Sequence, residues 1–249
     1  MSQDDSVRRK YDWLVLQEGS LPARPGRRFD TEAEHRCTSV LVWPEGAALS
    51  PENTIVTDPC FTDEGCVRAG SLLAALGVSW SDLGRFYLTH PHHDHCPCLP
   101  DLAEPIDLAP FEPVADGPLA DMATVPCPGH YPTLAALVFP SVFGDRVWIV
   151  GDAVLDEPWL RAWEYYWLNG YSQSAIIETW QSLAVIFSDA DLIVPGHGPP
   201  IRVTKPLLED LLESFPAAEH AGRCPEVAEA IRRRLERLSA QGAAEESSR

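Results

Sequence analysis

Thr-His-Pro-His-His-Asp-His, at residues 89–95, is the most informative segment of the sequence. Neutral imidazoles and carboxylates are ligands that Zn²⁺ prefers, and Fe and Mn accept the same donors. In an extended loop, His90 and His92 project to the same side. Asp94 and His95 follow directly and can face a second ion. The segment therefore predicts a site for two divalent metal ions.

Further histidines and carboxylates follow predicted strands elsewhere in the chain. We predict strands at residues 53–57, 85–89, 146–150 and 192–194, and shortly after them come Asp58, His90, Asp152 and His197 respectively. Strand ends at one edge of a sheet can bring together residues from distant parts of a chain. We therefore expect these four side chains to converge.

The rest of the chain has the alternation of strands and helices that is typical of an α/β protein. Further strands are expected at residues 11–17, 37–43 and 134–139, and helices at residues 65–76, 159–168, 175–187, 204–215 and 226–238. Residues 99–125 show no regular pattern and are expected to form a loop. The folded core is expected over about residues 11–239, with frayed ends.

Together these residues resemble the signature of the metallo-β-lactamase superfamily, which adds His130 in Pro128-Gly129-His130. The resemblance implies that His90, His92 and His130 hold one ion, that Asp94, His95 and His197 hold the other, and that Asp152 bridges both. It implies that Asp58 orients a ligand through a hydrogen bond. It also implies one domain over residues 1–249, folded as a four-layer αβ/βα sandwich of two mixed sheets flanked by helices.

Seven nitrogen and oxygen ligands favour a catalytic site, because structural zinc sites are usually closed, four-coordinate and rich in cysteine. We expect two divalent ions, with Zn²⁺ first and Fe or Mn as alternatives, to generate a bridging hydroxide that attacks a carbonyl centre. Asp94 or Asp152 is the expected proton carrier. True β-lactamases resemble this pattern but carry Cys or Ser where Asp152 stands, so the resemblance favours hydrolysis of a carboxylic ester, thioester or lactone.

Three alternatives stay open at this point. A phosphodiesterase or nuclease would use the same two-metal site, an iron-dependent oxygenase or redox enzyme would use its ligands differently, and a binding protein would hold the metal structurally. The formal net charge of −18 argues against nucleic acid as a partner, because a negative field repels phosphate backbones. A small-molecule substrate is expected instead.

The sequence shows no apolar run long enough for a membrane span and no apolar signal core at its start. With an odd cysteine count and no disulfide-like spacing, we expect a reduced, cytoplasmic protein. We interpret Cys96, Cys98 and Cys127 as small buried hydrophobic residues.

Aromatic residues are dense in the segment 159–171, and their role has two interpretations. They are Trp159, Trp163, Tyr165, Tyr166, Trp167 and Tyr171. Packing in the core or in a homodimer is the first interpretation, and a hydrophobic wall of the substrate pocket is the second. A phenol from Tyr165, Tyr166 or Tyr171 is a hypothetical donor to an oxyanion. His35 and His220 are expected to be surface residues, and His93 is expected either to face solvent or to lie just behind the metal ligands.

Overall fold

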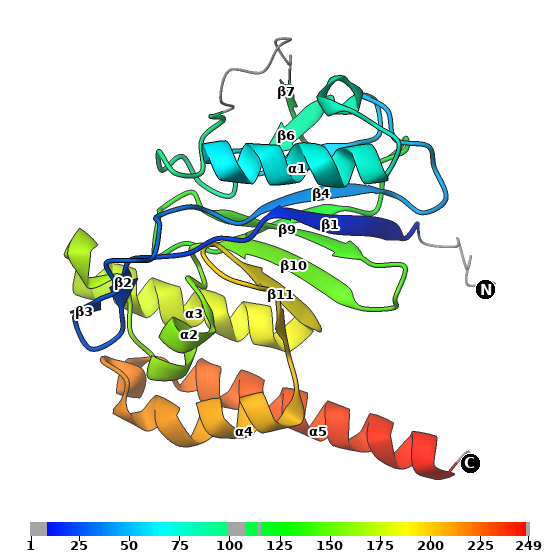
Figure 1. The fold of residues 1–249 in the computed structure, drawn as a ribbon. Coiled ribbons are helices and arrows are strands. Elements are labelled where there is room, and N and C mark those ends of the chain that lie inside the picture. Colours follow the sequence, from blue (N-terminus) through cyan, green and yellow to red (C-terminus); the bar gives the residue numbers. More distant parts are fainter. Residues whose placement is uncertain (1–8, 99–107, 114–115, 248–249) are drawn as a thin grey trace.

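The computed structural model describes residues 9–98, 108–113 and 116–247, and its centre is a pair of five-stranded sheets that face each other (Figure 1). The first sheet has the order β1 (Tyr11–Gln17), β4 (Ser39–Pro44), β5 (Ile55–Thr57), β6 (Arg85–Tyr87) and β7 (Ala109–Pro110). The second has the order β12 (Ile201–Arg202), β11 (Leu192–Pro195), β10 (Arg146–Gly151), β9 (Ala135–Pro140) and β8 (Ala123–Pro126). Both sheets are mixed, because β5 and β6 pair in parallel, as do β10 and β11.

Helices cover the outer faces of both sheets (Figure 1). The first sheet is covered by α1 (Asp63–Ala75), and the second by α3 (Gln173–Asp189) with the short α2 (Glu157–Ala162). Outside α3 lie α4 (Lys205–Ser214) and α5 (Pro225–Ser247). A separate hairpin of β2 (Ala23–Arg24) and β3 (Arg28–Phe29) lies beside α2. The expected four-layer α/β sandwich is confirmed.

Alternation along β4 explains how the first sheet joins two hydrophobic layers. Successive side chains of a strand point to opposite faces. Val40 and Val42 accordingly pack toward the second sheet, in a cluster that contains Phe139 and Ile149. Leu41 points the other way and belongs to the cluster under α1. All five side chains are buried, so both faces of this strand hold the layers together.

The second sheet shows the same division. Trp148 on β10 packs against the helices in a cluster that includes Trp180 and Phe187 of α3 and Leu208 of α4. Ile149, the next residue, faces the first sheet. Burial of such large apolar side chains contributes roughly 1.5–3 kcal/mol each. The helical layer is therefore an integral part of the core.

Several predicted element boundaries hold closely. The helix expected at residues 65–76 begins slightly earlier, where the Thr62 hydroxyl accepts a hydrogen bond of 3.0 Å from Gly65 N–H as an N-cap. Gly77 follows its end with a φ of 77°, which glycine adopts without strain. The strands predicted at residues 134–139 and 146–150 are β9 and β10, which pair in antiparallel register from Leu137↔Ile149 to Pro140↔Arg146.

The helix predicted for residues 159–168 is wrong in most of its length. Helix α2 ends at Ala162, and Trp163 adopts a left-handed φ of 49°. The Trp163 ring is buried against Trp180 and Phe215, at ring-centroid distances of 5.6 and 4.6 Å. Its indole N–H donates to the carbonyl of Leu211 at 3.2 Å. Tertiary packing of this one side chain outweighs the local helical pattern.

The ends of the chain and the loop at residues 99–125 also differ from expectation. The expected fraying after residue 239 is wrong, because α5 runs to Ser247. The expected loop contains β7 and β8, while residues 99–107 and 114–115 of it, and the N-terminal residues 1–8, lie outside the described part. None of the helices in that described part is sufficiently long and apolar to cross a membrane.

Candidate metal centre

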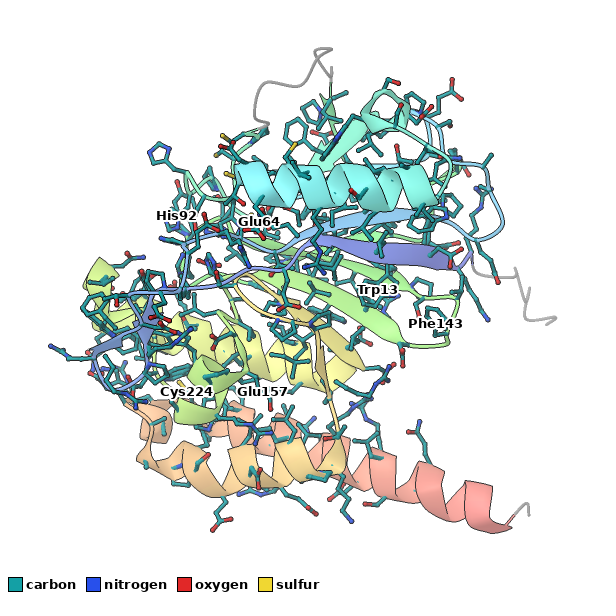
Figure 2. All side chains as sticks on the ribbon, in the orientation of Figure 1. Trp13, Glu64, His92, Phe143, Glu157 and Cys224 are labelled. Carbon is teal, nitrogen blue, oxygen red and sulfur yellow. The ribbon has the colours of Figure 1, made fainter. Side chains whose placement is uncertain are left out.

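The candidate ligands lie at one end of the two sheets, where strand ends from both sheets meet. In Figure 2, His92 lies at this end, and Phe143, in the turn between β9 and β10, lies at the other. The first sheet contributes its ligands from the segments after β5 and β6, and the second from the segments after β8, β10 and β11. In sequence order these residues are Asp58, His90, His92, Asp94, His95, His130, Asp152 and His197. The four residues expected to converge from strand ends, Asp58, His90, Asp152 and His197, all lie at this end.

A first group of four ligand atoms forms around His92. Its Nδ1 lies 3.0 Å from His90 Nε2 and 3.0 Å from His130 Nε2. Asp152 Oδ2 lies 3.2 Å from the same nitrogen of His130. Each of the four residues offers one atom within 4.8 Å of the others, which is a spacing that a single ion can span.

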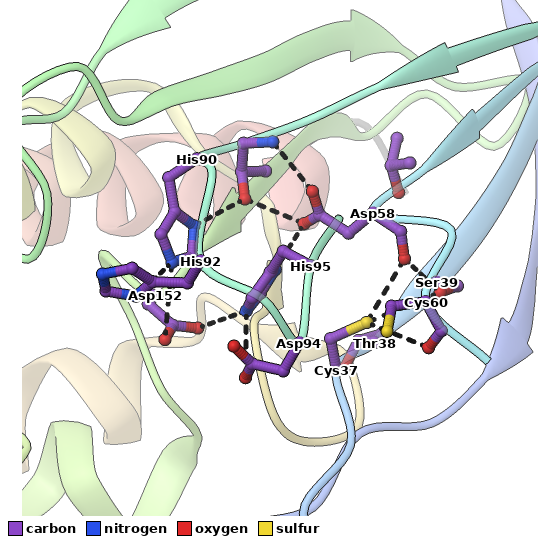
Figure 3. Close-up of polar contacts among 12 residues, drawn as sticks. Cys37, Thr38, Ser39, Asp58, Cys60, His90, His92, Asp94, His95 and Asp152 are labelled. Atoms are coloured by element: carbon purple, nitrogen blue, oxygen red, sulfur yellow. Dashed lines mark hydrogen bonds and ion pairs between the residues drawn. The ribbon is translucent and has the colours of Figure 1, made fainter. Parts of the chain in front are cut away.

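A second group forms on the other side of Asp152 (Figure 3). Asp152 Oδ1 lies 3.2 Å from His95 Nε2 and 3.1 Å from His197 Nε2. Asp94 Oδ2 approaches the same two nitrogens, at 3.8 Å and 3.4 Å. The two oxygens of Asp152 thus face different groups of histidines. This is the geometry of a carboxylate that can bridge two ions.

The atoms at the centre of the second group fit a metal ion. Among the described residues, His95 Nε2 and Asp152 Oδ1 are buried and make no well-directed hydrogen bond, although the two atoms lie 3.2 Å apart. A buried polar atom without a partner costs about 1–3 kcal/mol. A cation between these atoms would remove that cost, because imidazole nitrogen and carboxylate oxygen are both metal donors.

Asp58 organises one histidine of each group, and Figure 3 shows its place beside His95. Its Oδ1 accepts from Thr89 N–H at 2.8 Å, and its Oδ2 accepts from the Thr89 hydroxyl at 2.8 Å. Since that hydroxyl proton is used, Thr89 Oγ1 is left to accept from His90 Nδ1, 3.1 Å away. Asp58 Oδ2 also lies 3.0 Å from His95 Nδ1. Both rings therefore turn their Nε2 atoms toward the groups.

His197 and His130 also face the groups with Nε2, and the Nδ1 atom of each ring has a fixed partner. His197 Nδ1 lies 2.9 Å from the carbonyl oxygen of Arg36, which can only accept. His130 Nδ1 lies 2.6 Å from the hydroxyl of Tyr171. These contacts fix the orientation of each ring, and the carbonyl fixes the tautomer of His197 with the proton on Nδ1.

Burial sets the charge of the first group. It lowers the pKa of His90 to about 2 and that of His130 to about 4, and it lowers the pKa of His92 as well. These imidazoles are neutral at pH 7, which is the form that binds metals. Burial also opposes charge on His95 and His197, but the carboxylate of Asp152 outweighs it and raises both pKa values.

His35 is the residue that the sequence did not reveal. It was expected to be a plain surface residue, and its side chain is 45% exposed. Its Nε2 nevertheless lies 3.0 Å from Asp94 Oδ2, and its ring contacts that of His197 edge to face at 5.3 Å. A lone histidine in an irregular segment gives no periodic or motif signal. His93, in contrast, is exposed as expected.

An open cavity of about 490 Å³ lies over the two groups. It is lined by Leu21, His35, His92, His93, Asp94, His130, Asp152, Leu155, Tyr166, Asn169, Tyr171 and His197. Of the aromatic segment, Trp159 and Trp163 are buried in the core, whereas Tyr166 and Tyr171 line the cavity.

The cysteines near the site only partly match expectation. Cys127 is buried, but Cys96 is half-buried and Cys98 is exposed, so the interpretation as a buried residue is wrong for Cys98. Cys98 sits at the end of the ligand loop, where its carbonyl accepts from Phe61 N–H at 2.9 Å and its N–H donates to Pro59 at 3.0 Å. These backbone bonds fix the loop end beside the segment that carries Asp58.

Comparisons with known proteins find a likeness in structure but none in sequence. No protein-family model matches the sequence, and no curated protein matches it either. A candidate metallo-β-lactamase from Thermotoga maritima aligns over 100% of its own chain and 78% of this one, with 14% identity and a TM-score of 0.51. A metallo-β-lactamase family protein from Thermus thermophilus aligns over 94% of its chain and 93% of this one, with 16% identity and a TM-score of 0.47.

The likeness to the Thermotoga maritima protein concerns the fold, and it agrees with the two mixed sheets and the helices outside them. The His and Asp groups lie at the strand ends of this sandwich, where they could hold metal ions. The chain has the metallo-β-lactamase fold.

Proposed function

We propose that this chain is a two-metal hydrolase that cleaves a carboxylic ester, thioester or lactone. The observation that carries the proposal is the position of Asp152, whose two oxygens face two separate groups of histidines at 3.1–3.2 Å. A carboxylate in this place can hold two divalent ions side by side. The donors suit Zn²⁺ first, and Fe or Mn as alternatives.

Two divalent ions in these groups would supply an acidified water and polarise the substrate's carbonyl oxygen. The chain's own part is to hold the donors still and to move protons. His90, His92 and His130 stay neutral because burial lowers their pKa values, so they are ready to bind without releasing a proton.

Asp94 is the proposed proton carrier. Burial opposes its charge, but a hydrogen bond from His35 and the charges of His95 and His197 outweigh burial and hold its pKa below the usual value. Its side chain is 28% exposed, whereas that of Asp152 is 5% exposed. Asp94 is thus a carboxylate on the cavity side of the groups, where it can accept a proton and pass it to a leaving group.

The cavity favours a small, carbonyl-centred substrate. Its volume of about 490 Å³ suits a small molecule. Among the described residues that line it there is neither lysine nor arginine, the side chains that usually bind phosphate oxygens. Tyr166 and Tyr171 offer an aromatic surface for an acyl chain. A phosphodiester would enter this cavity without a cationic partner, in a chain of net charge −18.

The test compares a γ-lactone, an acyl thioester and a model phosphodiester as substrates of the zinc-loaded protein, at identical salt. We expect carbonyl substrates to turn over faster, and His92→Ala to reduce that turnover at least about 100-fold. His220→Asn is the control, since His220 lies outside the residues that line the cavity and its replacement should leave turnover within about twofold. Faster cleavage of the phosphodiester would overturn the substrate class. Oxygen consumption by an iron-loaded protein that hydrolyses nothing would overturn hydrolysis itself.

A further inference from the structure

His35 reaches the second group from a segment that is not part of either large sheet. It follows the β2–β3 hairpin and precedes β4. The neighbouring Arg36 exchanges two backbone hydrogen bonds with Ser20, at 2.9 and 3.1 Å. Arg36 also places its carbonyl oxygen 2.9 Å from His197 Nδ1. The backbone beside His35 therefore contacts the second group independently of the His35 side chain.

The His35 side chain adds two contacts of its own. Its Nε2 lies 3.0 Å from Asp94 Oδ2, the oxygen that also approaches the His197 and His95 rings. Its ring meets the His197 ring edge to face. One ligand atom each from His35, Asp94 and His197 lies within 4.8 Å of the other two.

Asp94 needs a partner more than the other carboxylate does. Asp152 has histidine nitrogens within 3.2 Å of both its oxygens, whereas the side chain of Asp94 is 28% exposed and lies at the edge of the second group. A hydrogen bond from outside is the usual way in which a ligating carboxylate is kept in place. An imidazole with its proton on Nε2 donates such a bond.

We infer that His35 is a positioning residue of the second metal site, which holds Asp94 so that its Oδ2 binds the ion together with His95 and His197. This rests on the two-metal function proposed above. Because the segment that carries His35 also holds His197 through Arg36, it acts on two ligands of the same ion. The first group, around His92, contacts neither His35 nor Arg36 through any described hydrogen bond.

The experiment is a stepwise metal titration of the full chain with Zn²⁺ against a chromophoric chelator, repeated with Co²⁺ to follow its visible absorption. Four proteins are compared: the unaltered chain, His35→Ala, His35→Gln and His93→Ala. We expect His35→Ala to lower the affinity for the second ion about 10–100-fold and the affinity for the first ion less than about twofold. His35→Gln should recover most of that loss, because its amide N–H can donate to Asp94. His93→Ala should bind both ions like the unaltered chain.

The outcomes separate this inference from the proposed function. If the unaltered chain binds only one ion, the two-metal function fails. If it binds two ions and His35→Ala does so with unchanged affinities, the role of His35 is overturned. An equal loss of affinity for both ions would show a general structural effect and would also overturn the role of His35. Failure of His35→Gln to recover the second ion would overturn the hydrogen bond as its means.

Discussion

Asp58 Oδ2 lies 3.0 Å from His95 Nδ1, and the same oxygen accepts a hydrogen bond from the hydroxyl of Thr89. Through Thr89 it also determines which nitrogen of His90 carries the proton. His90 belongs to the first ligand group and His95 to the second. One buried carboxylate thus prepares a histidine for each proposed ion.

Asp58→Asn should fold but bind metal poorly. The amide cannot accept from all the donors that surround Asp58, so the rings of His90 and His95 would turn protonated nitrogens toward the groups. We expect affinity for both ions to fall about 10–100-fold. Asp63→Asn, on the exposed start of α1, is the control for loss of charge alone. Chelator competition measures both variants, and unaltered affinity in Asp58→Asn would contradict the role given to Asp58.

Loading of the two groups should differ in its dependence on pH. Burial lowers the pKa values of His90, His92 and His130, so the affinity of the first group should depend little on pH above about 6.5, the usual pKa of a histidine. The pKa values of His95 and His197 are raised, mainly because Asp152 outweighs their burial. At pH 7 an ion must therefore displace at least one proton from the second group, and its affinity should rise with pH, about tenfold per unit for each proton displaced.

Calorimetric titration in two buffers of different ionisation enthalpy counts these protons directly. The expected result is buffer-dependent heat only for the step that loads the second group. Equal proton release in both steps would show that the two groups do not differ in charge.

Tyr171→Phe should affect the first group. The Tyr171 hydroxyl holds His130 Nδ1 at 2.6 Å and accepts from Asn169 Nδ2 at 2.7 Å. Its removal leaves the His130 ring free to turn, so we expect affinity for the first ion to fall about tenfold, with a matching loss of turnover at limiting metal. Tyr165→Phe is the control, because that hydroxyl bonds Glu219 instead. Unchanged turnover and affinity in Tyr171→Phe would also exclude its hydroxyl as an oxyanion donor.

Gly151 should tolerate no side chain. It has a φ of 51°, and a Cβ there would lie 2.2 Å from the Thr89 hydroxyl oxygen. Gly144, in the β9–β10 turn, has a φ of 87° with nothing within 4 Å of such a Cβ. We expect Gly144→Ala to cost about 1–2 kcal/mol in free energy of unfolding, from backbone strain alone. Gly151→Ala should cost about 2–3 kcal/mol more, from overpacking, as measured by urea denaturation.

The parts of the site that could be predicted from the sequence are those that follow strands. Val56, Val147 and Ile193 belong to short apolar runs, and the polar residues that end such runs must lie at a sheet edge. The parallel pairing of β5 with β6 then brings Asp58 beside the ligand loop, and the parallel pairing of β10 with β11 brings Asp152 beside His197.

What could not be predicted depends on contacts between segments without periodicity. His35 meets Asp94 through a segment whose path is set by backbone bonds between Ser20 and Arg36. Helix α2 stops because Trp163 packs into a pocket made by later helices. Neither contact can be predicted from the local sequence.

The way in which the two sheets share the ligands has a consequence for assembly. His90, His92, Asp94 and His95 follow strands of the first sheet, and His130, Asp152 and His197 follow strands of the second. Each proposed ion would thus take two ligands from either half of the sandwich. A chain whose halves have not yet docked can offer an ion only half a coordination sphere. Metal would then bind tightly only after the two halves have docked. Metal binding and the last step of folding would therefore be one coupled equilibrium.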